Sequence, residues 1–303
     1  MTLDLTNHDE RRLPGPGPEN EMKSKMPSTM QARTLTALGT EVHYLTGGQG
    51  PPLLLIHGIG ESNNSWSTNY EVLGRHFRLY APDLIGWGQT APSAEYHNDL
   101  DGLADFILTF MDAVGLDETF VVGWSLGGAA TIAAVARAPE RFPRVMLLAP
   151  AGLGREVHWM FRVIYLPLLG EMMLMPNMLT MRTIYQWLYA RDHRTVSQEF
   201  MARALEKARK PWHRTSTLSF VRARHALSQG QAELDMRSQL HRLTMPVRIL
   251  WGRQDRVLPM AEGQAAMSLL PQGSLVVLEE CGHMPMVEQV DRFHAEVLGF
   301  FAG

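Results

Sequence analysis

Residues 119–128 read Thr-Phe-Val-Val-Gly-Trp-Ser-Leu-Gly-Gly, which places Ser125 between a short apolar run and an alanine-rich segment. The run is typical of a buried β-strand, and residues 126–137 carry apolar side chains at helical spacing. A chain that passes directly from strand to helix must turn sharply, and glycines at positions 123 and 127 leave room for that turn. The G-x-S-x-G pattern in this context predicts a nucleophilic serine whose hydroxyl stands above the end of a strand.

Similar apolar runs recur along the chain, separated by longer segments with helical periodicity. This alternation predicts an α/β fold with a mostly parallel sheet and helices on both faces. A hairpin formed by residues 32–38 and 41–45 is expected to precede the parallel strands. The expected strands are residues 53–56, 77–81, 119–123, 144–149, 247–251 and 274–278, and the expected helices are residues 100–114, 126–137 and 287–300.

The alternation stops between residues 152 and 243, where no strand pattern occurs and Met and aromatic residues accumulate. We therefore expect a flexible tail over 1–30, an α/β core formed by 31–151 and 244–303, and a helical cap inserted at 152–243. A cap inserted at this point would lie over Ser125, so an apolar pocket is expected beneath it. Taken singly, each Met or aromatic residue of this segment is more typical of ordinary core packing than of a substrate contact.

The composition limits the classes of partner. The 303 residues include 28 Lys and Arg against 31 Asp and Glu, a net charge of −3, so nucleic acid is not an expected partner. No membrane span is expected, because Pro167 and Pro176 interrupt the apolar residues 163–181. A single cysteine, Cys281, fits the reducing cytoplasm, and a chain of this length needs no partner to fold, so we expect a cytoplasmic monomer or homodimer.

A serine hydroxyl needs a histidine to accept its proton and a carboxylate to orient that histidine. Asp255 follows the expected strand 247–251, and His283 follows the expected strand 274–278. Because sites in open α/β sheets lie at the carboxyl ends of the strands, Ser125, Asp255 and His283 are expected to converge at one edge. Their order along the chain, serine then acid then histidine, is the order that accompanies the G-x-S-x-G turn.

Simpler interpretations of the same residues have less support. A Gly-Ser-Gly turn can merely join a strand to a helix, but a matched acid and base at the same sheet edge favour the catalytic interpretation. Cys281 is more typical of a small buried filler than of a thiol nucleophile, because no second motif supports the latter. No metal or cofactor is expected, since the chain has neither an H-E-x-x-H helix nor paired cysteines and its glycine pairs complete no phosphate-binding fingerprint.

The sequence over residues 40–300 resembles the α/β-hydrolase superfamily, and within it the capped esterases and meta-cleavage-product hydrolases. Three of the motifs that carry the resemblance surround Ser125, Asp255 and His283. The other two are His57-Gly58-Ile59-Gly60 and Pro82-Asp83-Leu84-Ile85-Gly86-Trp87-Gly88-Gln89-Thr90.

The resemblance implies an oxyanion hole formed by the backbone N–H groups of Leu126 and Ile59, with Gly60 as the alternative to Ile59. Prealigned donors of this kind stabilise the charge that develops on a carbonyl oxygen during attack. The resemblance also implies that His57 orients its loop and performs no chemistry.

These assignments predict two-step hydrolysis of small to medium, uncharged, apolar carboxylic esters. Ser125 would attack the carbonyl, His283 would protonate the leaving alcohol, and water would cleave the acyl-enzyme. Trp124 and Met284, which adjoin the nucleophile and the base, are expected to contact the substrate; for Trp124 the alternative is packing inside the sheet.

Two other functions are consistent with the sequence. The first is carbon–carbon bond hydrolysis of a vinylogous diketone acid, which meta-cleavage-product hydrolases perform with the same triad. Arg203 resembles the cap arginine of that branch, but Met284 stands where many of its members have Trp after the histidine. The second is a ligand-binding protein that keeps the hydrolase fold with little turnover.

Overall fold

The computed structural model describes residues 30–154, 159–189, 196–228 and 235–302. Of the tail expected over residues 1–30, Met30 alone is described, and it begins the first strand. The rest of that tail lies outside the described residues.

An eight-stranded sheet forms the centre of the fold, in the order β1-β2-β4-β3-β5-β6-β7-β8. The pairs β1–β2 and β2–β4 are antiparallel, and every pair from β4 to β8 is parallel. Every expected strand overlaps an observed one, so the α/β fold is confirmed. The strands are β1 Met30–Ala37, β2 Thr40–Gly47, β3 Pro52–Ile56, β4 Arg78–Pro82, β5 Phe120–Trp124, β6 Val145–Leu148, β7 Val247–Gly252 and β8 Gly273–Leu278.

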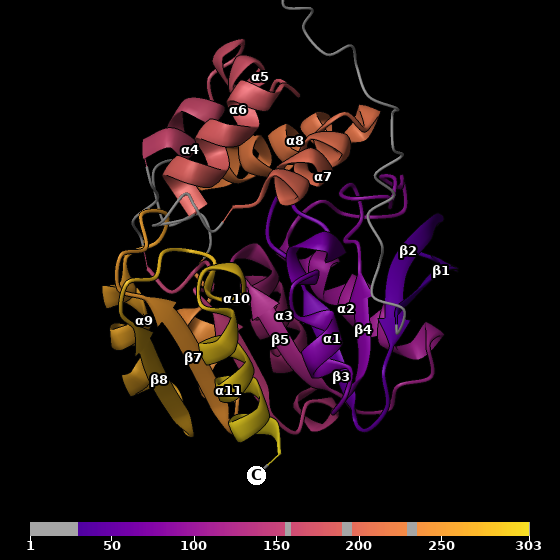
Figure 1. Cartoon of the computed structure of the whole chain (residues 1–303), viewed down its shortest axis with the longest axis vertical. Helices are drawn as coiled ribbons and strands as arrows, with labels where there is room; N and C mark the ends of the chain where they lie inside the picture. The colour runs from indigo at the N-terminus through magenta and orange to yellow at the C-terminus, as the bar shows by residue number, and fades with distance from the viewer. Residues whose placement is uncertain (1–29, 155–158, 190–195, 229–234, 303) are drawn as a thin grey trace, which may run out of the picture.

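Helices cover both faces of this sheet (Figure 1). Strands in the middle, such as β3 and β6, are buried almost completely, as expected of strands with helices on either side. The core helices are α1 Tyr70–Leu73, α2 Leu100–Ala113, α3 Leu126–Arg137, α9 Met260–Ala266, α10 Pro285–Glu288 and α11 Val290–Phe301. Short 3-10 helices are η1 Asn63–Trp66, η2 Pro139–Arg141, η5 Arg237–Arg242 and η6 Met267–Leu269.

The expected helix over residues 287–300 is confirmed over most of its length by α11, but residues 287 and 288 belong to the separate helix α10. Gln289 leaves the helical conformation, with φ −133° and ψ 61°. Its side-chain amide donates a hydrogen bond to the backbone carbonyl of Glu279, and the carboxylate of Glu288 turns back to bind the chain before α10. These contacts outside the helix account for the break.

The described part of residues 152–243 contains helices and turns and no strand. Its helices are α4 Trp159–Ile164, α5 Leu169–Met173, α6 Met178–Thr183, the π-helix η3 Ile184–Tyr189, α7 Gln198–Ala208 and α8 Pro211–Ser228. Helices α4–α8 form a layer above the edge toward which the parallel strands point (Figure 1). We call this layer the cap; its boundaries at 152 and 243 stay a prediction.

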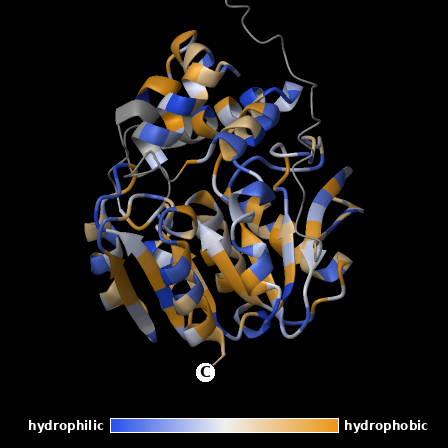
Figure 2. Cartoon of the chain, viewed as in Figure 1, coloured by the Kyte–Doolittle hydropathy of each residue, from blue (hydrophilic) through white to orange (hydrophobic). Residues whose placement is uncertain are grey.

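Hydrophobic residues are spread over the cap helices as well as the sheet (Figure 2). Pro167 lies between α4 and α5, and Pro176 lies between α5 and α6, so the apolar residues 163–181 form short helices. Within the described residues we find no helix that combines the length and apolarity needed to cross a bilayer.

Candidate active site

Ser125 occupies a sharp turn between β5 and α3. Its backbone has φ 54° and ψ −119°, a conformation that residues with side chains rarely adopt. Hydrogen bonds hold it there, because its N–H donates to the carbonyl of Leu148 at 2.9 Å and its carbonyl accepts from Gly128 and Ala151 at 2.9 and 3.0 Å. The strained turn expected from the sequence is therefore present.

Close backbone contacts explain the glycines around Ser125. A Cβ at Gly127 would collide with the carbonyl oxygens of Ile56 and His57. A Cβ at Gly58, in the loop after β3, would lie 3.1 Å from the Cβ of Ser125. The loop that carries the expected oxyanion donor therefore packs directly against the turn.

His283 and Asp255 form a buried pair above the ends of β8 and β7. The Nδ1 atom of His283 lies 2.7 Å from Oδ2 of Asp255, and both side chains are fully buried. The other carboxylate oxygen accepts hydrogen bonds from the N–H groups of Val257 and Leu258 at 2.7 and 3.0 Å. An ionised Asp255 in this position makes Nδ1 the donor, which leaves Nε2 unprotonated and able to accept a proton.

Nε2 of His283 is buried and has no hydrogen-bond partner among the described residues. Asp255 and His283 are thus in contact, but Nε2 of His283 makes no hydrogen bond with the hydroxyl of Ser125. Catalytic hydrogen bonds are often long in the absence of substrate. The complete triad stays a prediction.

Three residues from different parts of the chain hold the segment around His283. The indole N–H of Trp124 donates to the carbonyl of His283 at 2.8 Å, and the N–H of His283 donates to the carbonyl of Tyr189 at 3.0 Å. The carboxylate of Glu288 accepts from the N–H groups on either side of His283, at 2.9 and 3.0 Å. Core, cap and C-terminal segment therefore all fix the position of the imidazole.

Tyr189 also stacks on the imidazole, with ring centroids 5.9 Å apart and planes inclined by 22°. Sequence reasoning grouped Tyr189 with the aromatic residues of the cap and missed this contact, because nothing in its local pattern marks it. Trp124 and Met284 are fully or almost fully buried, and neither lines the cavity that the described residues form between the loop after β3 and the cap. Their role in substrate binding stays a prediction.

His57 joins the loop after β3 to the loop after β4. Its Nδ1 lies 2.8 Å from the carbonyl of Gly58, so Nδ1 is the donor, and Nε2 accepts from the N–H of Leu84 at 2.9 Å. Burial lowers the pKa of His57, which favours this neutral form. Both ring nitrogens are occupied, as expected of a residue that orients its loop.

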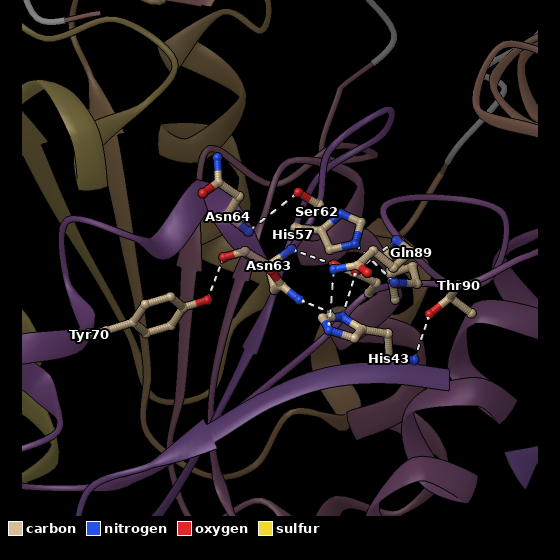
Figure 3. A network of polar contacts seen from close by, with 10 residues as sticks. His43, His57, Ser62, Asn63, Asn64, Tyr70, Gln89 and Thr90 are labelled. Atoms are coloured by element: carbon tan, nitrogen blue, oxygen red, sulfur yellow. Dashed lines mark hydrogen bonds and ion pairs between the residues drawn. The ribbon is translucent and has the colours of Figure 1, made fainter. Parts of the chain in front are cut away.

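A polar network around Asp83 supports the same two loops. Its carboxylate accepts from the backbone N–H groups of Asn63 and Gln89 at 2.7 and 2.9 Å and lies 3.2 Å from Nδ1 of His43. Figure 3 shows the side chains of His43, Asn63 and Gln89 gathered at this point. The network fixes the backbone that follows Ile59.

The N–H groups of Ile59 and Leu126 are the expected oxyanion donors. Within the described chain neither donates a hydrogen bond to another protein atom. Leu126 is the first residue of α3, where N–H groups lack a partner inside the helix. Neither group therefore has a partner among the described residues, and the oxyanion hole stays a prediction.

An apolar cavity lies between the loop after β3 and the cap. Its lining includes Ile59, Gly60 and Glu61 of that loop, and Tyr189, whose ring stacks on His283. Ser125 itself is not among the lining residues. Cap residues supply the apolar walls, namely Ile164, Met173, Leu174, Met181, Ile184 and Ala208.

Charged residues in this cavity were not anticipated from the sequence. Lys207 lines it and pairs with Glu61, whose carboxylate oxygen lies 2.7 Å from the ammonium nitrogen. Arg203, one turn earlier on α7, pairs instead with Glu199 and is not a lining residue. Glu61 lies next to the His57-Gly58-Ile59-Gly60 motif, but only the folded cap places Lys207 opposite it.

We expect Gly127→Ala to destabilise the turn, because the added Cβ meets backbone oxygens that cannot move aside without shifting β3. Gly299→Ala in α11 is the matched control, since its added Cβ meets no atom within 4 Å. Urea unfolding should give a lower free energy of unfolding for Gly127→Ala, by about 2 kcal/mol or more, and no loss for Gly299→Ala. Equal stability of the two variants would contradict the packing described for the turn.

Cys281 should be unreactive in the folded protein. Its side chain is fully buried, and burial, followed by the charges of Glu288 and Asp255, raises the pKa of its thiol. A thiol-specific chromogenic disulfide at pH 8 should label Cys281 only after denaturant is added, and Cys281→Ala should keep full hydrolytic activity. Rapid labelling of the native protein together with loss of activity would support a thiol nucleophile instead.

Comparisons with known proteins agree with this architecture. A family model described as the alpha/beta hydrolase fold matches residues 51–290. An uncharacterised protein of Mycobacterium tuberculosis is 28% identical over 88% of this chain and 79% of its own length. A 2-hydroxy-6-oxo-2,4-heptadienoate hydrolase of Pseudomonas putida is 29% identical over 89% of this chain and 96% of its own length.

Among solved structures, a meta-cleavage product hydrolase from Pseudomonas fluorescens IP01 superposes with a TM-score of 0.78. It is 28% identical and covers 89% of this chain and 97% of its own. The family model matches most of the chain, and the eight-stranded sheet and the strained turn at Ser125 agree with it. This chain therefore belongs to the α/β-hydrolase fold family and is a hydrolase.

Proposed function

We propose that this protein is a serine hydrolase that cleaves uncharged, apolar carboxylic esters through an acyl-enzyme on Ser125. The observation that carries the proposal is the buried pair of His283 and Asp255, held at the same sheet edge as the strained turn of Ser125. In the proposed reaction His283 accepts the proton of Ser125 during attack and then gives it to the leaving alcohol. In the second half-reaction His283 accepts a proton from the water that attacks the acyl-enzyme and gives it to the oxygen of Ser125 as the acid leaves.

The backbone N–H groups of Ile59 and Leu126 are the proposed donors to the carbonyl oxygen. Support comes from their lack of partners among the described residues and from the close packing of the loop at Gly58 against Ser125. The contribution of one such donor is typically on the order of a hundredfold or more in rate. Because both donors belong to the backbone, their loss would follow from a shift of the loop rather than from a change of side chain.

The apolar walls of the cavity favour the ester substrate class. Such walls would bury the hydrocarbon of an acyl chain, which carries no polar groups in need of partners. A short or medium acyl chain entering from the side of Ile59 would contact Met and Ile side chains of the cap.

Carbon–carbon bond hydrolysis of a meta-cleavage product is the second candidate, and the comparisons favour it. Named relatives act on dienoates, including the Pseudomonas putida enzyme, and the structure from Pseudomonas fluorescens is a meta-cleavage product hydrolase. Among the described residues that line the cavity there is no arginine of the kind that this function would use on an anionic substrate, and Arg203 pairs with Glu199 on α7. We therefore place ester hydrolysis first.

The remaining expectations stay proposals. They are a small-molecule ester substrate, no cofactor or metal, a monomer or homodimer, and a cytoplasmic location.

Replacing Ser125 with Ala should lower kcat for a short-chain p-nitrophenyl ester by on the order of 10⁴ or more, because the nucleophile is lost while its supports remain. Thermal unfolding should show an intact fold. Undiminished turnover by the folded variant would refute the assignment of the nucleophile.

A parallel assay of the wild type separates the two candidate reactions. The loss of absorbance of a yellow 2-hydroxy-6-oxo-dienoate should be slow beside p-nitrophenyl butyrate hydrolysis, because the cavity offers an anionic substrate no unpaired cation among the described residues. A kcat/KM for the dienoate above that for the ester would reverse our ranking.

A further inference from the structure

The cavity contains a buried ion pair that the proposed reaction does not use. Lys207 and Glu61 are less than a tenth exposed and lie 2.7 Å apart, Nζ to Oε2. Ser65 donates to the same carboxylate oxygen at 2.9 Å, and the hydroxyl of Tyr185 donates to the other oxygen. The ammonium group also lies 3.0 Å from that hydroxyl. Both oxygens of the Glu61 carboxylate therefore accept hydrogen bonds, and the ammonium group of Lys207 has two oxygen partners.

The pair makes the described lining of the cavity electrically neutral. His213 also lines the cavity. Burial, helped by the charge of Lys207, lowers the pKa of His213 to about 3, so its imidazole carries no charge near neutral pH. Among the described lining residues Lys207 is then the one cation and Glu61 the one anion. A charge buried in such surroundings is costly unless a partner of opposite sign is close.

An anionic group entering the cavity would have to compete with Glu61 for Lys207. It would also be placed near the carboxylate of Glu61, where repulsion in a poorly solvated site is stronger than in water. An uncharged group meets neither penalty. The pair thus opposes carboxylate-bearing groups although a lysine is present.

Glu61 is placed where this effect would matter for catalysis. It lies two residues after Ile59, and its N–H donates to the carbonyl of Gly58 at 3.2 Å, in the same turn that would hold the oxyanion donor. Ile59 and Glu61 both line the cavity, so an acyl chain that occupied it with its carbonyl oxygen bound at Ile59 would lie close to Glu61.

We propose that Glu61 is a specificity-determining residue: by neutralising Lys207 inside the cavity, it makes the site accept uncharged acyl groups and reject acyl groups that end in a carboxylate. The proposal rests on the proposed ester hydrolysis at Ser125 and specifies its substrate class. Removing the charge of Glu61 alone should convert Lys207 into an unpaired cation and reverse the preference.

The test compares two esters with the same six-carbon acyl chain, p-nitrophenyl hexanoate and the mono-p-nitrophenyl ester of adipic acid. The wild type should prefer the hexanoate. Glu61→Gln keeps the shape and frees Lys207, so kcat/KM for the adipate relative to the hexanoate should rise about tenfold or more, mainly through KM. Glu199→Gln is the matched control, because it breaks an exposed pair on α7 outside the cavity and should leave the ratio unchanged.

The double variant Glu61→Gln with Lys207→Gln removes both charges. It keeps the proposal testable if the single variant misfolds, because replacing a whole buried pair is usually tolerated better than breaking it. Its ratio should return toward that of the wild type. An unchanged ratio in folded Glu61→Gln, or a raised adipate preference in the double variant, would overturn the proposal.

Binding separates this proposal from the proposed function. Calorimetric titration of the Ser125→Ala variant with hexanamide and with adipamate measures charge preference without turnover. Tighter binding of adipamate than of hexanamide would overturn the role of Glu61 even if the esters are cleaved. If the variant prefers hexanamide but the wild type cleaves neither ester, only the proposed ester reaction is refuted.

Discussion

A single backbone conformation at Ser125 organises the site. With φ at 54°, the residue can join β5 to α3 without an intervening loop, and the side chain is left at the carboxyl edge of the sheet. This conformation is unfavourable for a residue with a Cβ, so it persists only because its neighbours hold the backbone on both sides. The close approach of Gly127 and Gly58 to adjacent segments follows from the same turn.

The position of His283, the proposed base, depends on contacts from outside its own segment. Asp255 orients the imidazole, but Trp124, Tyr189 and Glu288 fix the backbone and the plane of His283. Because Tyr189 belongs to the cap, a change in cap position would alter the surroundings of the base as well as access to the cavity. Tyr189 thus both lines the cavity and packs on the imidazole of His283.

Local patterns were sufficient to predict the sheet, the turn at Ser125 and the pairing of Asp255 with His283. Each of these features follows from short apolar runs or from residues placed directly after a strand. The contacts of Tyr189 and Lys207 could not be predicted in this way, because they depend on how the cap helices pack on the core. The break at Gln289 was missed for a related reason: the side chains that cause it bind segments outside the helix.

We propose that His283 and Asp255 activate the hydroxyl of Ser125. The most direct measurement is mass spectrometry of the protein treated with a fluorophosphonate, with the rate of modification compared between the wild type and His283→Ala. We expect one adduct, on the peptide that contains Ser125, and its formation should be far slower in the variant. An adduct on another residue, or equal rates in the two proteins, would contradict it.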